Sequence, residues 1–545
     1  MKKSIPLLLT CAVAVAVIAC SYKIMTPLSY LKQDIHLIAG SEHFKSTVGT
    51  LEKTIHTLHS NGDPDKFYPE LDIFNPYNGS LFPRDMASPT FVWEDWHPRS
   101  TMWLVSVSFD HTDHAVYVLT DKKQWTPDKT TWEIIKANSL DRKASVTITG
   151  IDRDNSCELL TRYGITFSTS GDEVGTPIFY AQMPLPFARA KGHPELFQWR
   201  FGTVSSYEKP PVVMQNLPVC GNCHHFSRDG KIFGMDMDYN KDKGAYILTP
   251  VREEMLLTRD DFITWNDFRG SGYGKSSGFF SRISPDGRYV ISTVKEQSFF
   301  AMLSDPDFSQ LFFPARGHIA WYDIEKGTFS ALPGADDPDY VQTCPAWSPD
   351  GGHIVFSRAR VDRRLLEVLD GKDYINVGAD VRISDLNKKY RIHFDLYRVP
   401  FNNGNGGTPE PLAGAANNGR SNYFPRFSPD GKWIVFTQSP TGLAIQPESK
   451  LYIVPAEGGV ARKLRCNTNI MNSWHSWSPN GRWLVFSSKT NTPYTELFIT
   501  HIDVNGYDSP PVILSRFGAE DLACVAPEFV NLEPGAIRTI QVVGK

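Results

Sequence analysis

The sequence predicts an all-β fold, in which an N-terminal immunoglobulin-like or fibronectin-like β-sandwich is followed by a β-propeller of about six blades. Forty Gly, 38 Pro and 12% aromatic residues, with few long runs of helix formers, favour short strands joined by many turns. One turn motif recurs along the C-terminal half, and short β-rich runs fill the region before it. The 545 residues leave room for two or three domains.

Residues 1–20 read as a lipoprotein signal peptide. Two lysines precede an apolar run from Ile5 to Ala19, which is too short to span a bilayer comfortably. A small residue then precedes Cys20, which is the predicted lipidated first residue of the mature protein. Because Ile18 is bulkier than usual in such a cleavage box, an ordinary signal peptide and an uncleaved anchor stay open as alternatives. All three predict export, and lipidation predicts a periplasmic protein anchored to the cell membrane or the outer membrane.

The region that follows divides into a linker and a sandwich. Residues 21–79 are predicted to be an anchor-proximal linker with some helix, because the pattern from Ile35 to His59 is helical. Residues 80–205 are predicted to form the β-sandwich, with Trp93 or Trp103 as its core aromatic residue. Its short β-rich runs, separated by turns, are residues 91–94, 103–108, 115–119 and 144–150.

The junction, residues 206–224, ends in the sequence Cys220-Gly221-Asn222-Cys223-His224. Cys-x-x-Cys-His is the spacing that attaches c-type haem, which predicts one covalent haem c with thioether bonds to Cys220 and Cys223 and with His224 as the proximal iron ligand. The alternatives are a Cys220–Cys223 disulfide, a redox dithiol and half of a zinc site. With 8 Cys and 15 His in the chain, the pentapeptide is rare by chance. Haem attachment outside the bacterial cytoplasm agrees with the predicted export.

The sixth iron ligand is the next question for this haem. Met235 and Met237 lie a short way downstream and are the possible distal ligands. A Met ligand raises the reduction potential and suits electron transfer, whereas an empty position suits binding of a small molecule. A single haem cannot carry electrons far alone, so a redox role predicts a docking protein.

The turn motif recurs at intervals of roughly 50 to 80 residues. It stands as Ser-Pro-Asp-Gly or Ser-Pro-Asn-Gly at residues 284–287, 348–351, 428–431 and 478–481, and in degenerate form as Ser-Arg-Asp-Gly at residues 227–230. Pro presets the first turn dihedral and Gly permits positive φ, so each motif is a tight hairpin turn before an apolar strand. This predicts a propeller over residues 225–535, followed by a C-terminal tail over residues 536–545.

These Ser-Pro-Asp-Gly-Lys-x-Ile/Leu-Val-Phe units resemble the propeller repeats of TolB and related periplasmic proteins. Together with the lipoprotein signal and the Cys-x-x-Cys-His motif, they make the chain similar to a group of exported TolB-like proteins from Bacteroidota. The resemblance implies the propeller fold, while propeller blades serve many unrelated tasks. TolB carries a small α/β domain before its propeller, whereas residues 80–205 here read as strands.

The net charge and the motifs of the sequence limit the classes of function that the protein can have. A net charge of −4 and a pI near 6.4 give no basic face for nucleic acid. No acid/base constellation predicts an enzyme. The leading hypothesis is a membrane-anchored propeller that uses its haem in electron transfer or in a haem-dependent interaction with an envelope or redox protein. The alternative is a haem-free periplasmic scaffold that binds envelope proteins or glycans, with Cys220–Cys223 as a structural disulfide.

Overall fold

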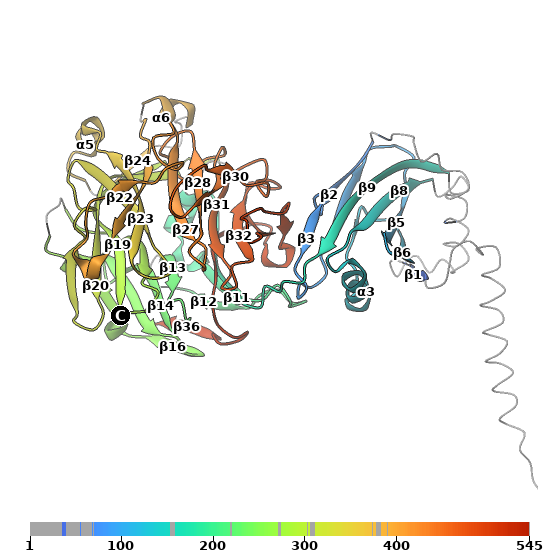
Figure 1. Ribbon diagram of the computed structural model, residues 1–545, viewed down its shortest axis with the longest axis horizontal. Helices are drawn as coiled ribbons and strands as arrows, with labels where there is room; N and C mark the ends of the chain where they lie inside the picture. Colours follow the sequence, from blue (N-terminus) through green and yellow to red (C-terminus); the bar gives the residue numbers. More distant parts are fainter. Residues whose placement is uncertain are drawn as a thin grey trace, which may run out of the picture. The chain divides into compact units, whose positions relative to one another are not determined.

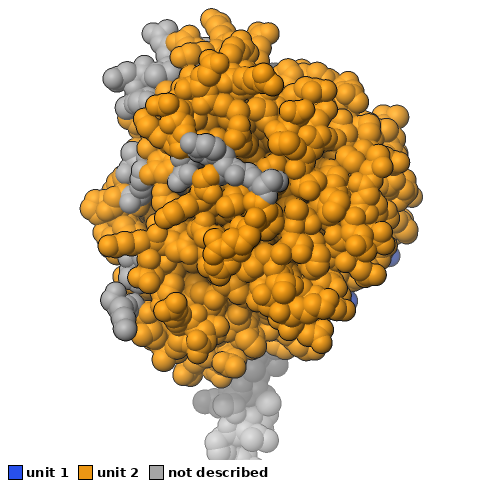
Figure 2. Space-filling model, turned by 90° about the vertical axis from the view of Figure 1, so that its left-hand side faces the viewer, with its two compact units in different colours: residues 1–84, 88–171 blue, residues 85–87, 172–545 orange. Residues whose placement is uncertain are grey.

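The computed structural model describes residues 35–39, 55, 68, 70–152, 158–217, 221–270, 274–301, 303–305, 311–372, 374–377, 383–389 and 391–543. The chain forms two compact units. Unit 1 comprises residues 1–84 and 88–171, and unit 2 comprises residues 85–87 and 172–545. Both are built mainly from strands (Figure 1), and Figure 2 colours the two units separately. No helix in the described part of the chain is long and apolar enough to cross a membrane.

The described residues of unit 1 form two sheets and the three-turn helix α3 (Lys129–Ser139). The six-stranded sheet runs in the order β1 (Ile35–Ala39), β6 (Thr112–Thr120), β5 (Met102–Phe109), β8 (Ala144–Ile151), β9 (Leu159–Thr169) and β3 (Ser80–Phe82). The three-stranded sheet runs β2 (Leu71–Asn75), β4 (Phe91–Asp95) and β7 (Gln124–Trp125). Helix α3 begins at Asp128, whose side chain accepts a hydrogen bond from the Thr131 backbone.

The structure does not confirm an immunoglobulin-like sandwich in unit 1. Immunoglobulin sheets are antiparallel, whereas β1 pairs with β6 and β3 pairs with β9 in parallel. The predicted helical pattern from Ile35 is wrong at its start, because Ile35–Ala39 forms β1 along the edge of the larger sheet. Trp93 and Trp103 are both buried, with ring centroids 6.3 Å apart, as expected of core aromatic residues.

Unit 2 is a ring of six four-stranded blades, numbered here in ring order. Blade 1 consists of β13 (Gly221–Phe226), β14 (Ile232–Tyr239), β15 (Asp242–Pro250) and β17 (Phe262–Thr264). Blade 2 consists of β18 (Phe279–Ile283), β19 (Tyr289–Ala301), β20 (Leu311–Asp323) and β21 (Thr328–Ala331). Blade 3 consists of β22 (Tyr340–Trp347), β23 (His353–Arg360), β25 (Asp395–Pro400) and β26 (Glu410–Pro411). Blade 4 consists of β27 (Ser421–Phe427), β28 (Trp433–Ser439), β29 (Lys450–Pro455) and β30 (Arg462–Lys463). Blade 5 consists of β31 (Asn472–Trp477), β32 (Trp483–Ser488), β33 (Glu496–His501) and β34 (Val512–Ile513). Blade 6 consists of β35 (Ala523–Phe529), β10 (Ile178–Met183), β11 (Gln198–Gly202) and β12 (Val212–Gln215).

The first strand named for each blade is the inner strand, and each inner strand neighbours those of the two adjacent blades, so that the ring closes. This arrangement is a six-bladed β-propeller. Blade 6 is assembled from both ends of the unit, because β35 pairs with β10. Strands β10, β11 and β12 therefore belong to the propeller unit. The boundary between the units lies at residue 171 rather than at the predicted residue 205.

Further elements are inserted into or added to the blades. Between β23 and β25 the chain forms α5 (Arg363–Leu369), β24 (Tyr374–Val377) and α6 (Ile383–Lys389). Strand β24 pairs with the distal half of the long strand β19. The C-terminal strand β36 (Thr539–Val542) pairs in parallel with β16 (Glu254–Leu257). The predicted C-terminal tail thus contains a strand.

The predicted hairpin turns are confirmed. In the turn of blade 4, the Ser428 hydroxyl donates to Asp430 Oδ1 (2.6 Å) and accepts from the Trp433 backbone (3.0 Å), which fixes the start of β28. The Gly that follows has φ +73° at Gly431, a conformation that favours glycine. The same Ser–Asp or Ser–Asn bond recurs in the other four turns, so all five have one geometry.

Candidate ligand-binding site on the propeller axis

The Cys-x-x-Cys-His motif enters blade 1 as a strand. Cys20 and Cys220 lie outside the described residues, while β13 carries the rest of the motif. Successive side chains of a strand point to opposite faces. Cys223 accordingly packs toward the axis, in a cluster with Phe280, Cys344 and Phe424. His224 packs into the space between blades 1 and 6.

His224 lies edge-on against Phe179 of β10, with ring centroids 4.6 Å apart. It is 3% exposed, and neither of its ring nitrogens has a hydrogen-bond partner among the described residues. Burial lowers the pKa of His224 to about 4, so the imidazole is neutral at pH 7. Burial likewise raises the pKa of the Cys223 thiol to about 12. Both groups are therefore uncharged.

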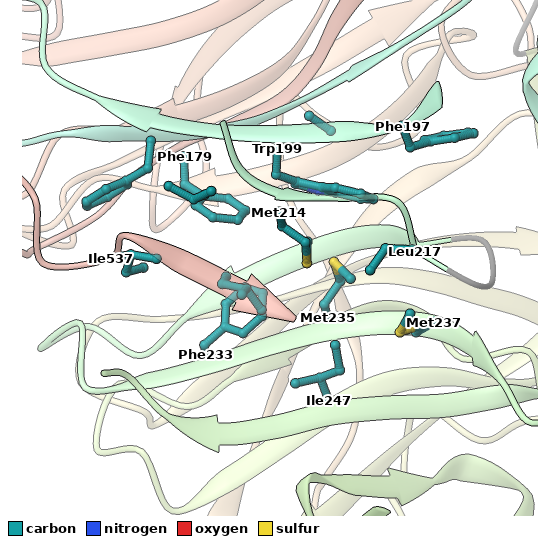
Figure 3. Packing of buried hydrophobic residues seen from close by; sticks show 14 of the residues in the cluster. Phe179, Phe197, Trp199, Met214, Leu217, Phe233, Met235, Met237, Ile247 and Ile537 are labelled. Carbon is teal, nitrogen blue, oxygen red and sulfur yellow. The ribbon is translucent and has the colours of Figure 1, made fainter. Parts of the chain in front are cut away.

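Met235 and Met237 are fully buried in the same inter-blade core as Met214 of β12 (Figure 3). Met235 is the cross-strand partner of His224, so the two side chains stand next to each other on one face of the sheet. A distal ligand must approach iron from the side opposite the proximal ligand. The strand register therefore argues against Met235 in that role.

The described residues do not fit a haem beside His224. The cavity that touches both Cys223 and His224 has a volume of about 70 Å³. Pockets for ligands of ordinary size measure about 300–1,000 Å³, and the haem macrocycle is not smaller than such ligands. Phe179 fills the space next to the imidazole. A porphyrin ligated by His224 requires Phe179 to move.

A larger cavity lies on the propeller axis, with a volume of about 400 Å³. Its wall takes two consecutive residues from each inner strand. The first residue of each pair, which in blades 1 to 5 stands two positions before the Ser of the turn, is in blade order His225, Arg282, Ala346, Arg426, Ser476 and Glu528. Its mouth is formed by the turns themselves, through Arg228, Pro285, Pro349, Pro429, Pro479 and Asn531. All six blades therefore build one central site.

The axial wall carries an unequal set of charges. His225 Nδ1 lies 2.7 Å from Glu528 Oε1, and Arg282 Nη1 lies 3.9 Å from Glu528 Oε2. Burial opposes ionisation of Glu528, but His225 and Arg282 outweigh it and hold the pKa of Glu528 below its ordinary value. Arg426 donates to the Pro425 carbonyl (2.8 Å) and makes no ion pair within the described part of the chain. Two arginines thus face one carboxylate.

Below this cavity the axis is filled by aromatic side chains. Phe280 of blade 2 and Phe424 of blade 4 have ring centroids 5.2 Å apart. These blades are not neighbours, so the contact crosses the axis. Phe424 also stacks on Trp474 of blade 5 at 4.7 Å. The cavity is therefore open toward the turns and blocked by this aromatic layer on its inner side.

His225 and Glu528 supply the axial cavity with side chains of types that bind metal ions. In the residues that the structure describes, no three His, Cys, Asp or Glu side chains come together as metal ligands. Sequence reasoning missed Arg282, Arg426 and Glu528, which lack a recognisable motif. The first two could have been found from register, because each stands two residues before the Ser of a turn.

Fold and site together define a six-bladed β-propeller with an axial cavity. No protein-family model and no curated protein matches the sequence. Among solved structures the chain is similar to TolB from Acinetobacter baumannii, at 15% identity and a TM-score of 0.41, with 71% of this chain and 79% of that chain covered. It is similar to an oligogalacturonate lyase from Vibrio parahaemolyticus, at 14% identity and a TM-score of 0.35, with 57% and 70% covered. Hydrazine synthase from Kuenenia stuttgartiensis gives 14% identity and a TM-score of 0.31, with 56% and 70% covered. The propeller assignment depends on this chain's own strand order.

Proposed function

We propose that this protein is a non-catalytic binding protein whose axial cavity takes a small anionic ligand. The observation that carries the proposal is the wall of this cavity, where Arg282 and Arg426 face only one carboxylate, Glu528. An arginine fork recognises carboxylate or phosphate oxygens in a bidentate manner. A cavity of about 400 Å³ suits one or two sugar rings better than a folded protein. Of the two envelope ligands that the sequence suggests, an acidic glycan is therefore favoured.

Calorimetric titration with glucuronate, and with glucose as its neutral counterpart, tests this proposal. The two sugars differ only in the carboxylate, so we expect glucuronate alone to bind. Arg426→Ala removes a charge-assisted hydrogen bond of about 1.5–3 kcal/mol, which weakens binding about tenfold or more. Arg364→Ala is the matched control, because Arg364 is an exposed arginine that pairs with Asp362 and lines neither the axial cavity nor the neighbouring cavity between blades 3 and 4. Equal binding of the two sugars, or of neither, contradicts the proposal.

Covalent haem c on Cys220 and Cys223, with His224 as its iron ligand, is the second candidate. Besides the motif itself, one structural observation supports it: His224 is neutral, and among the described residues it has a ring nitrogen without a hydrogen-bond partner, which is available to iron once Phe179 moves aside. Its role would be electron transfer or a haem-dependent protein interaction. Expression with a cytochrome c maturation system, followed by a pyridine haemochrome spectrum, tests it. Purified protein that is colourless and gives no haemochrome spectrum excludes this candidate and leaves the proposal of a ligand in the axial cavity unaffected.

Export and lipid anchoring are a separate part of the proposal. The apolar run up to Ala19 and the following Cys20 support a lipoprotein in the periplasm. Metabolic labelling with a palmitate analogue should mark the full chain and should not mark Cys20→Ala. Labelling that survives this substitution contradicts lipidation at Cys20.

A further inference from the structure

One of the five hairpin turns differs from the other four at the residue that follows the Ser. The residue after the Ser is Pro285, Pro349, Pro429 and Pro479 in blades 2 to 5, whereas blade 1 has Arg228. Proline offers no side-chain hydrogen bond, while arginine offers five N–H donors in a rigid fork with a permanent charge. The residue at this position can also contact a ligand, because all five residues line the mouth of the axial cavity.

Arg228 reaches across this mouth. Its Nη1 donates to the Pro349 carbonyl (3.0 Å) and its Nη2 to the Pro429 carbonyl (3.4 Å). Those prolines belong to blades 3 and 4, neither of which neighbours blade 1, so the side chain bridges the opening. Its backbone carbonyl accepts from Asn531 Nδ2 (3.3 Å), which ties the turn to the segment after β35.

The bridge also separates two cavities. Besides the axial cavity, a lateral cavity of about 430 Å³ lies between the turns of blades 3 and 4. Both cavities are lined by Arg228, Pro349, Phe427 and Pro429. The guanidinium with its two carbonyl partners is thus the partition between them.

The charge of Arg228 is not neutralised by these contacts. Its two acceptors are neutral carbonyls, and it makes no ion pair with any residue that the structure describes. An oxyanion offers an arginine charge–charge attraction and a bidentate geometry, which two separate neutral carbonyls do not offer. Arg228 is exposed, so its present bonds compete with water. An oxyanion that arrives at the mouth is therefore a better partner than the two carbonyls.

We propose that Arg228 determines specificity at the mouth of the axial cavity: it exchanges the Pro349 and Pro429 carbonyls for an oxyanion of the incoming ligand. This inference rests on the proposed binding function and adds the residue that selects the ligand. The carboxylate or phosphate group bound at Arg228 stands at the mouth, while Arg282 and Arg426 act deeper in the wall. Release of the bridge connects the axial and lateral cavities, which gives room for further sugar rings of a longer glycan.

Arg228→Pro tests the proposal with little risk to folding, because it installs the residue that the other four turns carry. We expect glucuronate to bind this variant about tenfold more weakly than the wild type, as the loss of one charge-assisted bond predicts. Lys231→Ala is the control, since it also removes a cation from this turn. Lys231 pairs with Asp229 and does not line the axial cavity. Unchanged affinity in Arg228→Pro overturns the inference while the binding function stands. Failure of the wild type to bind glucuronate overturns the binding function itself.

A second measurement decides the inference without any ligand. Cys223 lines the small inner cavity, which shares His225, Arg282, Arg426, Ser476 and Glu528 with the axial cavity. In a Cys220→Ser background, modification of Cys223 by anionic, cationic and neutral methanethiosulfonate reagents can be followed by mass spectrometry. We expect Arg228→Pro to raise the rate with the neutral reagent and to lower the ratio of the anionic to the cationic rate several-fold. If both quantities equal those of the Arg228 protein, Arg228 neither bridges the opening nor selects anions.

Discussion

Asp236 is a carboxyl group buried between blades 1 and 2, and it makes no ion pair with any residue in the described ranges. It is 1% exposed and accepts hydrogen bonds from the hydroxyl and the backbone N–H of Ser281 on the neighbouring inner strand. Burial raises the pKa of Asp236 to about 7, against the opposing effect of these two bonds. The pKa of the buried Glu296 is raised to about 7 for the same main reason. Below that pH the folded protein holds protons that the unfolded chain releases.

The pH dependence of stability follows from this difference. The folded pKa of Asp236 lies above its ordinary value of 3.8, so the free energy of unfolding falls as pH rises from about 4 to about 7. Asp236→Asn keeps the acceptor for Ser281 and removes the titration. We expect the slope of unfolding free energy between pH 5 and 7 to become less negative by up to about 1.4 kcal/mol per pH unit. Urea unfolding at several pH values measures it.

Asp350 provides the control of opposite sign for this experiment. It accepts from the Ser348 hydroxyl and from the Gly352 backbone, and the Ser348 bond is the main reason that its pKa lies below the ordinary value. Its contribution is present above pH 4 and is lost as pH falls further. Asp350→Asn should therefore leave the slope between pH 5 and 7 unchanged. A slope that stays at the wild-type value in Asp236→Asn shows that Asp236 is ionised in the folded protein.

At the scale of elements, the hairpin turns set the register of each blade. The Ser hydroxyl of a turn accepts from the first N–H of the next strand, as Ser478 does from Trp483 (2.9 Å). The Gly at the end of the turn has φ between +69° at Gly481 and +74° at Gly230. A side chain in this left-handed region is strained even where space is available. The motif thus encodes a backbone geometry in a few neighbouring residues, which is why it could be predicted from the sequence.

Gly431→Ala isolates this backbone effect, because the nearest atoms to an added Cβ lie 3.9 Å away, at ordinary contact distance. We expect a loss of about 1–2 kcal/mol in the free energy of unfolding, from the left-handed conformation alone. Gly192→Ala is the control, since Gly192 has no atom within 4 Å of an added Cβ and lacks a positive φ. Because Gly192 is the last residue of the short helix Phe187–Gly192, this substitution should leave stability unchanged or raise it by up to about 1 kcal/mol. Equal effects of the two substitutions would mean that the turn relaxes without strain.

Local sequence signals predicted the turns and strands but not the residues of the axial site. Ser-x-Asp-Gly turns and alternating strands are local signals, and the propeller followed from them. The prediction that Cys223 and His224 act on one cofactor came from spacing alone, whereas strand alternation sends the two side chains to different surroundings. The axial site collects residues from six separate strands, and nothing in a short stretch of sequence marks Glu528 as the partner of His225. Sites of this kind become visible only after the ring is closed.

At the scale of the whole molecule, ring closure decides which segments form one unit. Blade 6 joins β35 near the C-terminus to β10, β11 and β12, which precede all other blades in the chain. Tyr180 and Gln182 of β10 reinforce the closure, since both donate to the Phe517 carbonyl (2.9 and 3.0 Å). No local signal in residues 523–529 announces this long-range pairing. The predicted sandwich boundary was displaced for that reason.

Closure by β35 predicts a graded response to truncation. A chain that ends at Asp521 lacks β35, so β10 and the inner strands β31 and β13 lose their neighbour, and the axial wall loses Glu528. Exposed strand edges pair with other chains, so we expect aggregation and loss of a sharp thermal transition.

A chain that ends at Leu532 keeps β35 and loses β36 together with the segment before it. The lost residues include Ile540 of β36 and Ile537 of the preceding segment, which are both buried in the core between blades 1 and 6. Full burial of each side chain is worth about 1.5–3 kcal/mol, so the propeller unit of this chain should still unfold sharply, but at a lower temperature than the propeller unit of the full chain. Circular dichroism and size-exclusion chromatography distinguish the two truncations. If the chain that ends at Asp521 stays monomeric with the full chain's transition, the other five blades hold the ring without its closing strand, and the axial cavity does not depend on blade 6.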